Sequence, residues 1–130
     1  MIINGRDVTE VNTCKITDMS YLLSLYTEWN VSFVTNMRKM SSSTQVFNQS
    51  IGEWNISNVT NMSWMFSATQ AFNQPIGEWD VSNVIYMSEM FNSATSFNQN
   101  IKGWNVNNVL SSSLFATESS ALEDKNNPFK

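Results

Sequence analysis

The chain has 130 residues, of which 42% are hydrophobic and 14% are charged, and its formal net charge is −4 at pH 7. This length fits one domain, and the composition is that of a globular chain rather than a disordered one. The negative charge and the scattered placement of the seven Lys and Arg argue against a nucleic-acid surface. No apolar run is long enough to cross a bilayer, so we expect no membrane insertion.

Residues 1–15 are expected to form an N-terminal cap over the first repeat. Ile2 to Val8 has the pattern of a small hairpin, with Asn4-Gly5 in a type I′ turn. The first residues lack the basic and apolar segments of a signal peptide, which favours a cytoplasmic location if the chain is complete. Cys14 is the only cysteine, so no intramolecular disulfide is expected.

Residues 16–115 carry a regular repeat. Residues 47–66, FNQSIGEWNISNVTNMSWMF, are almost repeated in residues 72–91, FNQPIGEWDVSNVIYMSEMF, and a third copy opens at Phe97. The even spacing of Phe47, Phe72 and Phe97 predicts stacked coils in which equivalent side chains bury a shared core. The expected core columns are Trp29, Trp54, Trp79, Trp104; Val34, Val59, Val84, Val109; Met37, Met62, Met87; Met40, Met65, Met90; and Phe47, Phe72, Phe97.

Within one copy of the repeat, the interval between apolar residues changes from two residues to three or four. The alternation around Trp79 and Val81 predicts a short strand. From Val84 to Phe91 the apolar residues recur as on a helix of about two turns, with Ser82 or Asn83 as its N-cap. The spacing also resembles the leucine-rich-repeat frame. We therefore expect an α/β fold, a right-handed solenoid of about four to five coils, each with a short parallel strand and a short helix.

The repeat resembles one known family. Residues 54–66, WNISNVTNMSWMF, and residues 79–84, WDVSNV, match the W-D-V-S-N-V-T-N-M-S-x-M-F repeat of the BspA-like leucine-rich-repeat surface proteins. The resemblance covers roughly residues 16–115. It implies a surface or interaction protein at the cell surface, and it brings no catalytic residues to carry over. It leaves open that the chain is a fragment of a longer surface adhesin.

The ends of the array are expected to be irregular. Residues 111–115 match the expected helix only if one residue is deleted, and residues 116–130 are expected to form a C-terminal cap and tail, within one domain of residues 1–130. Leu122 is expected to fold back as an apolar plug, and residues 126–130 are expected to be frayed or to form a short arm. The amides of Asn48, Asn73 and Asn98 are expected to point inward and to bond turn backbone groups.

We assign no catalytic, cofactor or metal residues, and one acidic spot supports only alternative hypotheses. The chain has no histidine and only four glycines, and its carboxylates are scattered. Glu53 and Glu78 are expected to stack one coil apart beside Asp80, because they occupy equivalent positions in successive copies of the repeat. This acidic spot supports the alternative hypotheses of a carboxylate-dependent hydrolase, or of a module that binds a cation or a sugar.

The leading functional hypothesis is a non-catalytic repeat scaffold for protein–protein interaction. Stacked repeats present extended surfaces, and Phe33, Trp64 and Tyr86 are aromatic residues that interrupt the repeat's pattern. Exposed aromatic residues favour protein partners or self-association. We therefore expect these three residues to bind a protein partner or a second copy, and the chain to form a homo-oligomer.

Overall fold

The computed structural model describes residues 2–3, 6–7, 31–117 and 120–130. Strands β1 (Ile2–Ile3) and β2 (Arg6–Asp7) pair in an antiparallel register, with Ile2 opposite Asp7, which confirms the expected pairing in the N-terminal hairpin. The Asn4-Gly5 turn and the rest of the N-terminal cap lie outside the described residues. The one helical segment in the described part is η2, a 3₁₀ turn at Asp124–Asn126. The predicted α/β fold is therefore wrong, because helix and strand are almost absent.

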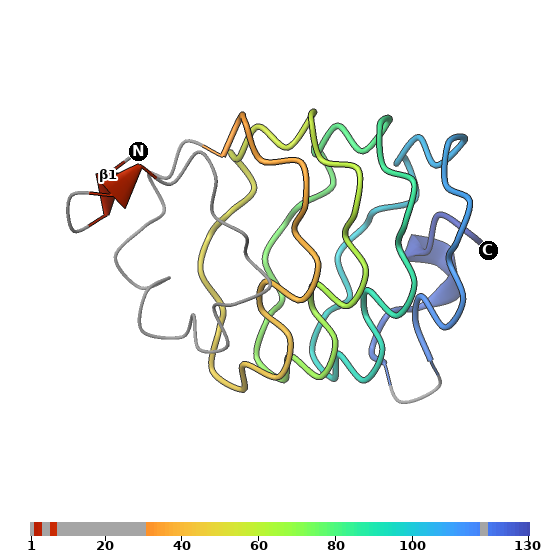
Figure 1. The fold of residues 1–130 in the computed structure, drawn as a ribbon. Coiled ribbons are helices and arrows are strands. Elements are labelled where there is room, and N and C mark those ends of the chain that lie inside the picture. Colours follow the sequence, from red (N-terminus) through yellow and green to blue (C-terminus); the bar gives the residue numbers. More distant parts are fainter. Residues whose placement is uncertain (1, 4–5, 8–30, 118–119) are drawn as a thin grey trace.

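From residue 31 onward the chain winds through successive coils that lie side by side (Figure 1). Backbone hydrogen bonds join equivalent positions of neighbouring coils: the N–H of Thr60 donates to the carbonyl of Thr35 over 2.8 Å, and the N–H of Ile85 to that of Thr60 over 2.8 Å. Isolated parallel bridges join Asn36, Asn61, Tyr86 and Ser111 in one row. The period of the repeat in the sequence is thus the offset between neighbouring coils.

The segment predicted to be helical consists of overlapping turns instead. The N–H of Met90 donates to the carbonyl of Met87, three residues back, whereas the N–H of Met87 donates to Ser111 in the next coil. Glu89 between them has a φ of 55°, as the third residue of a type II turn does. Alternate N–H groups donate to the next coil, so they do not form the hydrogen bonds of an α-helix, which run to the carbonyl four residues back. Positive φ recurs in two columns: Lys39, Trp64, Glu89 and Leu114, and then Ser43, Ala68 and Ser93.

The strand predicted around Trp79 is likewise replaced by two turns. The N–H of Trp79 donates to the carbonyl of Ile76 over 3.2 Å, and the N–H of Val84 to that of Val81 over 2.9 Å. Each turn places apolar residues at its first and fourth positions, and both residues face the interior. Only Asp80 separates the two turns. Ser82 does not cap a helix, because no helix follows it. Its N–H donates instead to a carboxylate oxygen of Asp80 over 3.0 Å.

The interior is a stack of equivalent side chains, as the repeat predicted. The buried members of the predicted columns include Trp54, Trp79, Trp104, Val59, Val84, Met37, Met62, Met87, Met40, Met65, Met90, Phe47, Phe72 and Phe97. Neighbouring rings are nearly parallel: the centroids of Phe66 and Phe72 are 4.2 Å apart, and those of Trp79 and Trp104 are 6.3 Å apart. The predicted core is therefore confirmed for most of the described residues, but Val34 and Val109 are only partly buried, and Trp29 lies outside the described residues.

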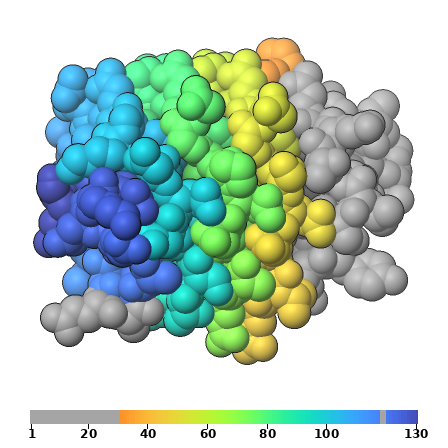
Figure 2. All heavy atoms as spheres, turned by 180° about the vertical axis from the view of Figure 1, so that it is seen from behind, coloured from red at the N-terminus to blue at the C-terminus, as the bar shows by residue number. Residues whose placement is uncertain are grey.

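Residues 120–130 form a C-terminal cap, shown in dark blue at one end of the stack in Figure 2. Leu122 is buried, which confirms the predicted plug. The prediction of a frayed end at residues 126–130 is wrong, because the ring of Phe129 meets that of Phe115 edge-on at 4.8 Å. The ammonium of Lys102 also donates to the carbonyls of Asn127 and Lys130.

The last coil keeps the register of the repeat without the deletion that we predicted. The N–H of Phe91 donates to the carbonyl of Phe115, just as that of Phe66 donates to Met90 in the preceding pair of coils. Phe115 therefore occupies the column of Met90, and Leu114 has the positive φ of its column. The substitution of Phe for Met in this column made the alignment look one residue short.

Candidate interaction surfaces

Trp64 lies on a ridge of turn residues that is defined by the first positive-φ column: Lys39, Trp64, Glu89 and Leu114. The guanidinium carbon of Arg38 is 4.6 Å from the centroid of the Trp64 ring, and the ammonium of Lys39 is 5.5 Å from it. Both cations are close enough to be attracted by the face of the indole. The ring is half-buried and is therefore held in one place on the surface of this turn ridge.

Tyr86 lies in the row of parallel bridges, and 46% of its surface is exposed. Its N–H donates to the carbonyl of Thr60, and its carbonyl accepts the N–H of Met62. Both the N–H and the carbonyl of Tyr86 are thus bonded to the preceding coil, while its side chain is exposed to solvent. Tyr86 is thus an exposed aromatic residue, whereas Trp64 is half-buried, and partner binding by either residue stays a prediction.

Phe33 is the most exposed of the three predicted partner-binding residues, at 67%. It occupies the position of Asn58 and Asn83 in the following coils, whose side-chain amides donate to the coil before them. No ring contact joins Phe33, Trp64 and Tyr86 in the part of the chain that the structure describes. The structure therefore presents them as separate exposed groups rather than as one aromatic cluster.

The repeated polar side chains bind neighbouring coils. The amides of Asn58, Asn83 and Asn108 each donate over 2.7 Å to the carbonyl of a serine in the preceding coil. Asn48 and Asn73 accept backbone N–H groups from the following coil through Oδ1, but both are exposed, so our prediction that this column points inward is wrong. These bonds hold the stack together and engage the side chains of the repeated asparagines.

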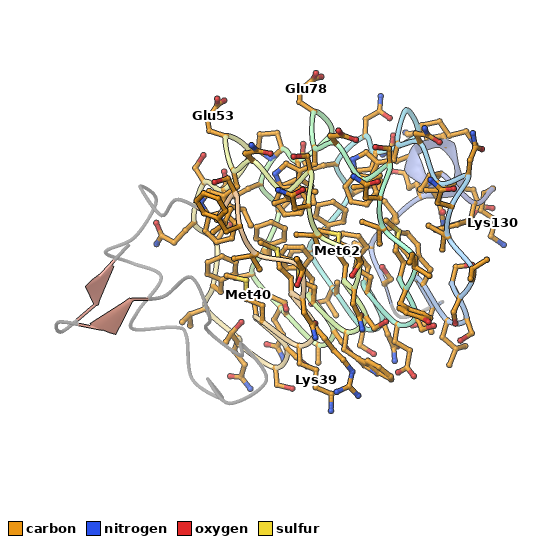
Figure 3. All side chains as sticks on the ribbon, turned by 45° about the horizontal axis from the view of Figure 1, so that its top comes forward. Lys39, Met40, Glu53, Met62, Glu78 and Lys130 are labelled. Atoms are coloured by element: carbon orange, nitrogen blue, oxygen red, sulfur yellow. The ribbon has the colours of Figure 1, made fainter. Side chains whose placement is uncertain are left out.

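Glu53 and Glu78 do lie next to each other on successive coils, and both point away from the stack on the side opposite Lys39 (Figure 3). They border a shallow hollow of about 440 Å³ that is also lined by Pro75, Gln99 and Asn100. Asp80 does not line this hollow. No group of three or more acidic, histidine or cysteine residues able to hold a metal occurs among the described residues. The structure thus brings Glu53 and Glu78 to one hollow but does not place Asp80 with them.

Asp80 has a structural partner of its own. The hydroxyl of Ser82 donates to its carboxylate over 2.6 Å, and the N–H of Ser82 donates over 3.0 Å. These two bonds lower the pKa of the Asp80 carboxyl below its ordinary value of 3.8. A general acid that works near neutral pH needs the opposite shift. The geometry therefore gives Asp80 the role of fixing a turn.

Sequence reasoning missed two exposed leucines of the described part. Leu110 is 81% exposed and Leu114 is 60% exposed, and both lie in the last coil. The sequence did contain a signal for the exposure of Leu114, since Leu114 follows Lys39, Trp64 and Glu89 in one column of the repeat. Residues 105–117 also carry no charge. It was overlooked because the assumed deletion shifted Leu114 into an interior column.

One family model matches most of the chain. Residues 24–128 match the model of the family described as "Mycoplasma protein of unknown function, DUF285". The chain belongs to this family. The family is associated with BspA-like repeats, in keeping with the resemblance in the sequence, whereas a leucine-rich repeat as such is not shown. Neither a curated protein nor a solved structure matches the chain significantly. Within the described residues, no helix is long and apolar enough to span a membrane.

Proposed function

We propose that this member of the DUF285 family is a non-catalytic scaffold that binds a protein partner and also self-associates. The observation that carries the proposal is the half-buried Trp64 side chain on the turn ridge, with Arg38 and Lys39 next to its ring. The repeated asparagines are engaged in bonds between coils, and Asp80 is engaged with Ser82. The exposed side chains of Phe33 and Tyr86, and the two cations beside Trp64, are available for recognition.

Such groups are suited to protein recognition. Tryptophan, tyrosine and arginine dominate the binding energy of protein interfaces, because they offer a large contact area together with polar contacts. A ring that is already fixed loses little conformational entropy when a partner binds it. The association of the family with BspA-like repeats supports the same function, since we expect such repeats to act in surface interactions.

The test is a quantitative pull-down from the native host with the Trp64→Ala/Tyr86→Ala variant. Because both side chains lie outside the buried core, the variant is expected to fold and to retain its partner at least about 10-fold less well. Val46→Ala is the matched control, since Val46 is 75% exposed and lies in a different turn. Equal capture by the wild type and the double variant would exclude these aromatic residues as the binding surface.

A further inference from the structure

Two cations lie beside Trp64, and no carboxylate of the described part pairs with either of them. The guanidinium carbon of Arg38 is 4.6 Å from the centroid of the indole ring, and the ammonium of Lys39 is 5.5 Å from it. The ion pair found among the described residues joins Lys125 to Glu123 in the C-terminal cap. The positive charges of Arg38 and Lys39 are therefore not neutralised by this part of the chain.

The two cations stand on the opposite side of the stack from a pair of exposed carboxylates. Glu53 and Glu78 point away from the stack on the side opposite Lys39 (Figure 3). In the coils that follow, the column of Arg38 continues with serines: Ser63, Ser88 and Ser113. The whole chain carries a net charge of −4, so this basic spot is a local exception to its charge. A local excess of positive charge attracts an anionic group to this one place on the surface.

The ring and the two cations together favour a carboxylate as the ligand. A guanidinium that lies over an aromatic face keeps the N–H groups at its edge available, and it binds a carboxylate through two parallel bonds. Lys39 adds a second charge beside the same ring, and the two like charges repel each other until an anion binds. The half-buried indole of Trp64 offers apolar area next to both cations. The spot therefore fits a carboxylate with an apolar group next to it.

The charge of the whole chain restricts the source of that carboxylate. Nucleic acids and anionic membranes present many phosphates and are bound by clusters of several Lys and Arg. The ridge offers two cations on a chain whose net charge of −4 repels such polyanions. A second copy is a poorer match, because its Glu53 and Glu78 lie on the side opposite its own ridge, and contacts between opposite sides propagate without closing. A protein segment with Asp or Glu beside an apolar residue matches both the charge and the ring.

We propose that the turn ridge at Trp64 binds an acidic segment of a protein partner. In this complex, carboxylates of the segment bond Arg38 and Lys39, and an apolar side chain of the segment covers the indole. The two cations already lie beside the ring, so they lose little conformational freedom when the segment binds. The inference rests on the scaffold proposal and names the chemistry of the partner.

The test is fluorescence anisotropy with a labelled peptide that has glutamates on both sides of a leucine. A matched peptide has glutamine in place of glutamate, and the wild type should bind it at least about 10-fold more weakly. The Arg38→Gln/Lys39→Gln variant, called the ridge variant, should lose at least about 10-fold in affinity for the glutamate peptide. It should fold, because neither side chain belongs to the buried core. Lys125→Gln/Lys130→Gln is the control, since it removes equal charge from two exposed residues of the C-terminal cap.

A salt titration gives a second measurement on the unmodified protein. The affinity for the glutamate peptide should fall at least about 5-fold as NaCl rises from roughly 50 to 500 mM, because salt screens the exposed charges. Equal affinity for the two peptides, no binding of the glutamate peptide, or an equal loss in the ridge variant and its control would overturn the inference. Tighter binding to phosphatidylserine vesicles than to the peptide, or loss of self-association in the ridge variant, would also overturn it, since the occupant would then be a membrane or a second copy.

The pull-down from the native host separates this inference from the scaffold proposal when the ridge variant is added to it. Trp64→Ala/Tyr86→Ala and the ridge variant should both lose the partner. If the aromatic variant loses the partner and the ridge variant retains it, the scaffold proposal stands and an acidic partner segment is excluded.

Discussion

Asparagine serves this fold in two opposite ways. In one column, Asn55 accepts the N–H of Ser57 through Oδ1, and Asp80 makes the same bond to Ser82 one coil later. In another column, Asn58 uses its amide nitrogen to donate to the carbonyl of Ser32. A carboxylate can replace the accepting group but not the donating one. The column of accepting residues therefore tolerates aspartate, whereas the donating column does not.

This difference predicts that Asn58→Asp destabilises the chain much more than Asn55→Asp. The first change removes a donor and places a carboxylate against a carbonyl oxygen, which we expect to lower the free energy of unfolding by about 1–2 kcal/mol. The second change copies the arrangement of Asp80 and Ser82 and should have little effect. Urea denaturation at pH 7 checks both variants, and equal destabilisation would refute the assignment of roles.

The lowered pKa of Asp80 predicts a weakening of the fold in acid. The bonds from Ser82 favour the carboxylate in the folded chain, so the unfolded chain binds the proton more readily. The stabilisation is therefore complete above the pKa of the unfolded chain, near 3.8, and is lost as the pH falls through the lower folded value. Asp80→Asn should reduce the acid dependence of the free energy of unfolding between about pH 5 and 2. An unchanged pH profile would contradict this account.

At the scale of one coil, the apolar spacing was compatible with two backbone conformations. Met87, Met90 and Phe91 have the spacing of a helix, but turns with apolar first and fourth residues produce the same pattern. The choice is made by acceptors in the next coil, such as the carbonyl of Ser111 for the N–H of Met87, which local spacing does not reveal. The core columns could be predicted because burial depends on the repeat alone, whereas the secondary structure depends on bonds between coils.

The coil corners contain glycine because the neighbouring coil approaches closely. A Cβ at Gly77 would lie 2.6 Å from the carbonyl oxygen of Asn100, whereas a Cβ at Gly103 would have no heavy atom within 4 Å. Gly77→Ala should therefore lower the free energy of unfolding by about 1–3 kcal/mol, the usual cost of overpacking. Gly103→Ala is the matched control and should be nearly neutral. Thermal unfolding compares them, and a neutral Gly77→Ala would show that the coils are not this close.

At the scale of the whole molecule, the last coil is uncharged, and the C-terminal cap beside it continues the register of the repeat. The burial of Leu122 was predicted, whereas the position of Phe129 could have been predicted from the period of the repeat but was concealed by the polar composition of the tail. The exposure of Phe33 and Tyr86 was predictable because they interrupt otherwise polar columns. The contact of Arg38 and Lys39 with Trp64 was not, because it joins two coils and depends on the positive φ of the turn ridge.

The central claim is that the backbone bonds of residues 84–94 alternate between their own turns and the next coil. Scalar couplings across hydrogen bonds, measured by NMR, identify the acceptor of each N–H directly. We predict a coupling from the nitrogen of Phe91 to the carbonyl carbon of Phe115, and one from Met87 to Ser111. A coupling from Phe91 to Met87, four residues back, would instead show an α-helix and contradict the account.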